Sequence, residues 1–190
     1  EALFETLVKS WRQNRDDALP FYYVQLSGID RPNWPEFRDS QRQMLGRIPH
    51  SGMAVSYDFG DSTNVHPTGK RAIGERLALL ALHGHYQRPV VASGPVARKA
   101  SLRNGSITLN FSSAQKLLTP NNAPLNGFEL VTRSGRRLPA HAVIAGGQVR
   151  IPVPAGEEIQ TVLYAYQPFT RANLYNEAVL PAATFSIALD

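Results

Sequence analysis

Residues 53–82, MAVSYDFGDSTNVHPTGKRAIGERLALLAL, place a short apolar run, a polar loop and an amphipathic segment in direct succession. The run over residues 53–58 is typical of a buried β-strand. From about residue 68 the apolar side chains recur at the spacing of an α-helix. We therefore predict a helix over residues 68–82 that turns these side chains inward: Ile73, Leu77, Leu80 and Ala81. A strand followed at once by a helix favours an α/β layered fold.

The residues before this stretch repeat the alternation of helix and strand. Residues 1–12, EALFETLVKSWR, have apolar side chains at positions 3, 4, 7, 8 and 11, which predicts an opening helix that ends near residues 14–17, before Pro20. It begins without a capping residue, so we expect that the chain was cut from a longer one. Residues 21–26, FYYVQL, predict a buried strand of a parallel sheet, and residues 36–45 predict a second helix.

The pattern changes near residues 87–89. From residue 96 onward, short alternating runs are separated by turn residues, and Asn104-Gly105 is a hairpin turn signal. Strands are expected over residues 128–132, 138–144, 149–153 and 161–166. Several short strands at this spacing predict a small all-β sandwich or jelly roll. The apolar tail, residues 173–185, is expected to be irregular and docked on a surface. We therefore predict two units, residues 1–88 and 89–190.

Composition excludes several classes of function. The 190 residues have a net charge of +5, and this charge is scattered. Nucleic-acid binding would need a basic stripe with interleaved aromatic residues, so we expect no nucleic-acid partner. No apolar stretch approaches the roughly 20 residues of a membrane span, so no membrane partner is expected either. The chain has no cysteine, and its histidines lack the spacing of metal ligands, so no metal site is predicted.

The polar loop over residues 60–70, GDSTNVHPTGK, carries the candidate chemistry. His66 follows a strand of an α/β sheet, which is where active sites collect, and histidine is the usual general base near neutral pH. Asp61 could orient His66 by accepting a hydrogen bond from its Nδ1–H, as in a serine-hydrolase triad. Asp58 is a competitor for that role. A structural histidine that caps or packs against the helix is the alternative.

The nucleophile is expected outside this chain. Gly60-Asp61-Ser62 has the letters of a lipase-like nucleophile motif, but Ser62 lies on the same loop as His66. Nothing after it supplies an oxyanion hole from backbone N–H groups. Three side chains could line a polar substrate cleft: Gln25, Arg38 and Gln41. Four aromatic side chains could stack on a sugar ring, or belong to the core: Trp34, Tyr164, Tyr166 and Tyr175.

Several segments together resemble the sialate O-acetylesterase-like branch of the SGNH hydrolases. Asn64-Val65-His66-Pro67, followed by Lys70 and by GERLA at residues 74–78, resembles the catalytic-histidine block of that family. Residues 20–26 resemble its strand that ends in Gln-Leu, and residues 34–41 its Trp…Arg…Gln helix. Its C-terminal β-domain is similar to residues 93–95, 127–130, 173–176 and 180–182.

The resemblance implies the C-terminal half of a three-layer SGNH-type α/β/α domain, followed by the β-sandwich. It implies a carbohydrate O-acetylesterase in which His66 and Asp61 complete a triad. The serine, in a Gly-Gln-Ser-Asn motif, and the oxyanion-hole glycine and asparagine would lie in the protein's own N-terminal portion. The family often has an acid two residues before the histidine, where Asn64 stands here.

That reaction needs no cofactor and takes an acetylated sugar or polysaccharide as its substrate. The resemblance also implies a periplasmic or secreted protein. Two other classes stay open at this point. One is a non-catalytic carbohydrate-binding module, and the other is an SGNH hydrolase that acts on lipid or thioester substrates.

Overall fold

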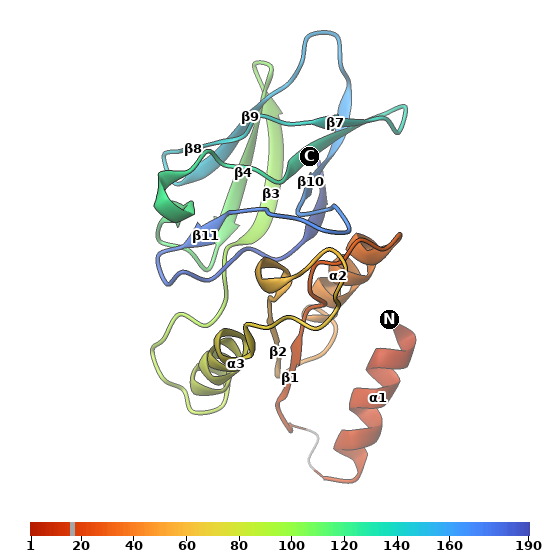
Figure 1. The fold of residues 1–190 in the computed structure, drawn as a ribbon, viewed down its shortest axis with the longest axis vertical. Coiled ribbons are helices and arrows are strands. Elements are labelled where there is room, and N and C mark those ends of the chain that lie inside the picture. Colours follow the sequence, from red (N-terminus) through yellow and green to blue (C-terminus); the bar gives the residue numbers. More distant parts are fainter. Residues whose placement is uncertain (16–17) are drawn as a thin grey trace.

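A two-stranded parallel sheet with helices around it forms the lower half of the computed structural model, which describes residues 1–15 and 18–190 (Figure 1). Its elements are α1 (Ala2–Gln13), β1 (Phe21–Val24), α2 (Trp34–Met44), β2 (Ser51–Ala54), the short 3-10 helix η1 (Tyr57–Phe59) and α3 (Lys70–Gly84). The predicted order of helices and strands is confirmed. The predicted end of the opening helix, residues 14–17, lies partly outside the described residues.

Helices α1 and α3 cover opposite faces of this sheet. The rings of Phe21 and Tyr23 meet Phe4 of α1 edge-on, with ring centroids 5.6 and 5.0 Å apart. The side chain between them, Tyr22, points to the other face, where its hydroxyl lies beside Gly84 of α3. Successive strand residues point to opposite faces, so a run of aromatic residues in β1 packs against both helices. The described part of this unit is therefore layered helix, sheet, helix.

The strand predicted over residues 53–58 is wrong at its C-terminal end. β2 stops at Ala54, and Tyr57–Phe59 form η1. The cause is tertiary: the Tyr57 side chain is fully buried, and its hydroxyl donates to the carbonyl of Ala182, 2.8 Å away. A hydrogen bond to a residue so distant in sequence leaves no local signal.

The β-rich half of the chain forms two four-stranded antiparallel sheets, seen in the upper half of Figure 1. One sheet has the order β12-β10-β6-β7 and the other β3-β4-β9-β8. Their strands are β3 (Val96–Arg103), β4 (Ser106–Ser112), β6 (Phe128–Thr132), β7 (Arg137–Pro139), β8 (Val143–Ala145), β9 (Gln148–Pro152), β10 (Ile159–Tyr164) and β12 (Phe185–Ala188); the short β5 (Leu117–Leu118) and β11 (Tyr175–Asn176) pair beside them. The fold is thus mixed α/β, with mostly antiparallel sheets and a small β-rich unit.

Two strand predictions in this unit need correction. The single strand expected over residues 138–144 is two strands in different sheets: β7 pairs with β6, and β8 pairs with β9. Pro139 has no N–H to donate, so the run ends there and the chain crosses to the other sheet. The tail is docked, as predicted, but it is not irregular throughout, because Phe185 begins β12 and is 2% exposed.

The two units share one interior. A single cluster of buried apolar side chains includes Val8 and Tyr57 from the helical unit and Leu130 and Phe185 from the sandwich. The expected boundary between residues 88 and 89 falls in the connection between α3 and β3. The later segment 165–184 returns from the sandwich to the helical unit, and this return brings it against the loop that carries His66.

Candidate active site

The loop between η1 and α3 takes its shape from two short polar side chains. The Asp61 carboxylate accepts hydrogen bonds from the Thr63 N–H at 2.8 Å, the Thr63 hydroxyl at 2.8 Å and the Asn64 N–H at 3.0 Å. These bonds lower the pKa of Asp61, because they stabilise its charged form. Asn64 then accepts the N–H of His66 at 2.9 Å. Asp61 and Asn64 therefore fold the loop that presents His66.

The structure places Asp61 and His66 on one loop but does not join their side chains. His66 is exposed, and its imidazole makes no hydrogen bond to any of residues 1–15 or 18–190. The contacts of Asp61 are instead local, with Thr63 and Asn64. The triad pairing of Asp61 with His66 stays a prediction. Ser62 is exposed on the same loop, and its carbonyl accepts the N–H of Asp30 at 3.0 Å.

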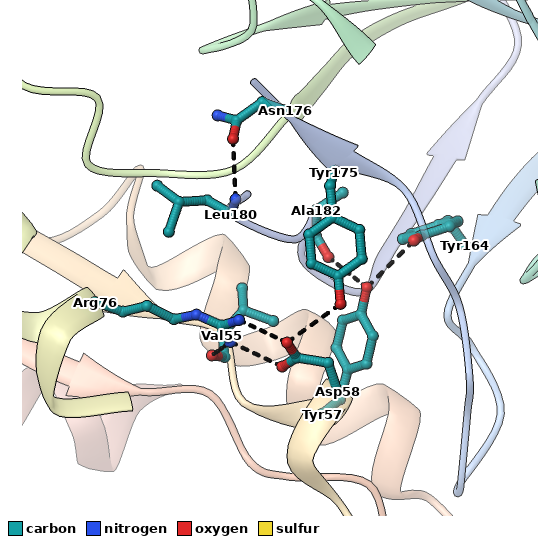
Figure 2. Close-up of polar contacts among 9 residues, drawn as sticks. All are labelled: Val55, Tyr57, Asp58, Arg76, Tyr164, Tyr175, Asn176, Leu180 and Ala182. Carbon is teal, nitrogen blue, oxygen red and sulfur yellow. Dashed lines mark hydrogen bonds and ion pairs between the residues drawn. The ribbon is translucent and has the colours of Figure 1, made fainter. Parts of the chain in front are cut away.

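Asp58, the competing partner, is already engaged. Arg76 of α3 donates to both of its carboxylate oxygens, at 2.8 and 2.6 Å, and the hydroxyl of Tyr175 donates to it at 3.3 Å (Figure 2). Each partner of the ion pair is 10% exposed. A carboxylate held in this way on both oxygens is not free to orient His66. Among the acids weighed from the sequence, Asp61 is the one left beside the histidine.

Sequence reasoning missed Arg76, although the signal was present. Arg76 lies between Ile73 and Leu80 on the inward face of α3, at the spacing of buried positions. A charged residue at such a position is rarely buried without a partner. The position of Arg76 on the buried face of the helix could therefore have indicated a buried acidic partner, without identifying which Asp or Glu it is.

A second loop lies alongside the His66 loop. The hydroxyl of Ser27 donates to the carbonyl of Val65 at 2.9 Å, and the indole N–H of Trp34 donates to the carbonyl of Ser27 at 2.6 Å. The sandwich also reaches this place, because Arg171 donates to the carbonyl of Gly60 at 3.4 Å. The residues around His66 are thus supplied by three separate segments of the chain.

In the described part of the chain, the three side chains of the predicted polar cleft, Gln25, Arg38 and Gln41, are held by contacts within the protein. Gln25 and Arg38 are fully buried, and the amide of Gln25 donates to the carbonyl of Arg38 at 2.9 Å. Gln41 accepts the N–H of Leu26 at 2.8 Å and donates to the carbonyl of Val24 at 3.1 Å. The side chains of Gln25 and Arg38 are both enclosed by the described residues, and their contact with a substrate stays a prediction. Gln41 holds backbone groups at the end of β1.

The four aromatic candidates lie in different environments. Tyr164 is fully buried and lies in the core of the sandwich, where its ring stacks near Phe185 at 5.3 Å. Tyr175 is bound to Asp58. Tyr166 lies under the guanidinium of Arg137, and Trp34 lies under that of Arg31, each 5.7 Å from the ring centroid. Through its bond to Ser27, Trp34 is the candidate beside the His66 loop.

A comparison with solved structures finds a carbohydrate acetylesterase that is similar along nearly the whole chain. That enzyme comes from Xanthomonas citri; it superposes on 97% of this chain with a TM-score of 0.90 and is 34% identical in sequence. The match covers 44% of the enzyme, so this chain spans less than half of its length. No family model and no curated protein sequence matches the chain.

Proposed function

We propose that this chain is the C-terminal portion of a carbohydrate O-acetylesterase of the sialate O-acetylesterase-like branch of the SGNH hydrolases. The observation that carries the proposal is the similarity to a carbohydrate acetylesterase over 97% of the chain at 34% identity. The exposed His66, on a loop at the carboxyl end of a parallel sheet, supports it, because a general base must be accessible to its substrate.

The proposed reaction proceeds through an acetyl-serine enzyme. His66 takes the proton of a serine supplied from outside this chain as the serine oxygen attacks the acetyl carbonyl carbon. His66 then gives that proton to the departing sugar oxygen. It next activates a water molecule, which releases acetate and restores the serine. Asp61 orients the imidazole and stabilises its charged form, and no cofactor takes part.

The proposed partner is the N-terminal portion of the same protein, which would carry the serine, glycine and asparagine blocks. Among the described strands, β1 pairs with β2 alone, which leaves its other edge open for a further strand. The nearby helix α1 exposes an apolar stripe of Leu3, Leu7 and Trp11, which are 88%, 43% and 56% exposed. An open strand edge beside an apolar helix face is the surface that a continuing α/β sheet would cover.

We place the protein in the periplasm or outside the cell, on the resemblance alone. The structure adds that no helix among the described residues is long and apolar enough to cross a membrane. An SGNH hydrolase of lipid or thioester substrates and a non-catalytic carbohydrate-binding module are the alternatives. Activity on esters of increasing acyl-chain length distinguishes the proposed acetylesterase from a lipid or thioester hydrolase, because an acetylesterase loses activity on long-chain esters.

The test is acetate release from an acetylated sugar and from a chromogenic acetate ester, with the full-length protein. We expect His66→Ala to lower kcat/KM by about a thousandfold or more, the loss that follows removal of one triad member. Asp61→Asn keeps an acceptor for the turn but removes the charge, so it tests what that charge contributes. His141→Ala is the matched control, since His141 is an exposed histidine of the sandwich.

Unchanged activity in a folded His66→Ala variant would remove His66 from the triad. The binding-module alternative predicts instead that the full-length wild-type protein binds the glycan and releases no acetate. Equal activity of Asp61→Asn and the wild type would remove Asp61 from the triad, with Asn64 as the next residue to substitute.

A further inference from the structure

The loop that carries His66 is closed at its base by an ion pair. Asp58 belongs to η1, immediately before the loop, and Arg76 belongs to α3, immediately after it. The two guanidinium nitrogens of Arg76 face the two carboxylate oxygens at 2.6 and 2.8 Å, as Figure 2 shows. A two-point contact between planar groups fixes orientation as well as distance. The two ends of the loop are therefore held in one mutual geometry.

Arg76 also contacts the chain before and after Asp58, at Val55 and Phe59. It donates to the carbonyl of Val55 at 2.6 Å, just after the end of β2. Its guanidinium lies over the ring of Phe59, 5.1 Å from the centroid. That ring in turn packs against Gly69, where an added Cβ would lie 2.4 Å from it. One side chain thus connects the end of the strand, η1 and the last residue of the His66 loop.

The sandwich contributes a third member to this arrangement. Tyr175 of β11 donates its hydroxyl to Asp58 at 3.3 Å, from the opposite side to Arg76 (Figure 2). Beside it, Tyr57 and Tyr164 join the two units through a contact of 3.2 Å between their hydroxyls. Desolvation by burial is the main cause that raises the pKa of Tyr175, so its hydroxyl stays a donor at neutral pH.

Stability alone does not explain a buried ion pair. Replacing such a pair by apolar side chains of similar volume is often neutral or stabilising, whereas its fork geometry specifies one arrangement. We propose that Asp58, Arg76 and Tyr175 form a positioning unit that sets where the His66 loop stands relative to the substrate. This inference rests on the proposed function, and it gives the sandwich a part in catalysis through Tyr175.

The test measures kcat and KM of the full-length protein with the chromogenic ester, well below the unfolding temperature. Arg76→Lys keeps the charge but loses the two-point contact; Tyr175→Phe removes one hydroxyl. We expect Arg76→Lys to lower kcat by about 10- to 100-fold with KM within about twofold, since a displacement near 1 Å can have such an effect. Tyr175→Phe should lower kcat by a smaller factor. The matched control is Arg71→Lys, because Arg71 pairs with Glu75 on the exposed side of the same helix.

A merely structural role gives a different result. It lowers the unfolding temperature of Arg76→Lys and Tyr175→Phe but leaves kcat within about twofold of the wild type; that outcome overturns the positioning role while His66→Ala remains inactive. Tyr175→Phe decides the matter if Arg76→Lys does not fold. Activity that survives His66→Ala overturns the catalytic role of His66 instead, and the positioning role with it. Absence of ester hydrolysis by the wild type overturns the proposed function itself.

Discussion

Arg38 gives the sharpest stability test of the contact between the two units. Its guanidinium is fully buried, and it donates to the carbonyls of Ala165 and Pro168 at 2.8 and 2.9 Å and to the hydroxyl of Thr184 at 2.9 Å. It also donates to the carbonyl of Gln167. Burial lowers the pKa of Arg38 to about 10, so the side chain is still charged at neutral pH. The perturbation is Arg38→Met, which keeps an unbranched, flexible but shorter side chain and removes every donor.

The magnitude follows from two opposing contributions. Arg38→Met removes four hydrogen bonds from a charged donor, at about 1.5 kcal/mol each, which is about 6 kcal/mol in all. The low end of the usual range applies because the carbonyls of Ala165 and Pro168 keep a second donor, from Thr184 and Ile29. Removing the charge relieves its desolvation, which the lowered pKa of Arg38 sets at about 3 kcal/mol. The net prediction is that Arg38→Met lowers the free energy of unfolding by about 3 kcal/mol.

The assay is urea denaturation at pH 7, followed by both circular dichroism and tryptophan fluorescence. For a protein of this size, the predicted change corresponds to an unfolding temperature lower by about 6–12 °C. Arg103→Met, at an exposed position that ends β3, should change stability by less than about 0.5 kcal/mol. A loss under about 1 kcal/mol for Arg38→Met would refute the reasoning, because water would then be satisfying the carbonyls.

Three further outcomes are expected. Gly60→Ala places a Cβ 2.5 Å from the backbone of Gly28, so the activity of the full-length protein should fall by about tenfold or more. Its control is Gly74→Ala, where an added Cβ meets nothing within 4 Å; this change should leave the activity unchanged and raise the unfolding temperature. Burial raises the pKa of six tyrosines, most strongly in four of them, so the folded state holds these protons more tightly. Their contribution to stability is complete below about pH 10 and falls above it, by up to about 1.4 kcal/mol per pH unit for each group, and urea midpoints at pH 9 and 11 measure the loss. The four are Tyr23, Tyr57, Tyr164 and Tyr175. The hydrogen bonds of its turn lower the pKa of Asp61. The turn therefore persists above the ordinary aspartate pKa and opens as the pH falls through the lowered pKa of Asp61. The check is faster hydrogen exchange of the Thr63 and Asn64 amides at low pH, after correction for intrinsic rates.

The parts of the fold that depend on neighbouring residues were predictable. Helical periodicity placed α2 and α3 within about two residues, the usual scatter of helix ends. Asn104 and Gly105 both have positive φ, 49° and 70°, as the hairpin turn read from the sequence requires. Periodicity and turn chemistry act over a few residues, so one sequence contains the whole signal.

The parts that depend on distant partners were not predictable. Arg38 was expected in a cleft, but its acceptors lie more than 120 residues further along the chain. Pro139 ends β7, yet the sheet that the chain joins next is decided by β9. At the candidate site, His66 and the Asp61 turn could be located from local spacing. Arg76 could be placed on the inward face of α3, but its carboxylate partner could not be chosen without the tertiary structure.

The buried contacts between the units bear on how such a protein can be rearranged. A charged side chain of one unit, Arg38, is solvated by backbone carbonyls of the other, and Tyr57 donates its hydroxyl to the carbonyl of Ala182 across the same boundary. Separating residues 1–88 from residues 89–190 would leave both halves with unsatisfied polar groups on an apolar surface. The β-sandwich therefore cannot be transferred alone to another enzyme by gene fusion, unlike a module that shares no buried contacts with its neighbour. An exchange of the sandwich between proteins would have to carry α2 and η1 along to keep these contacts.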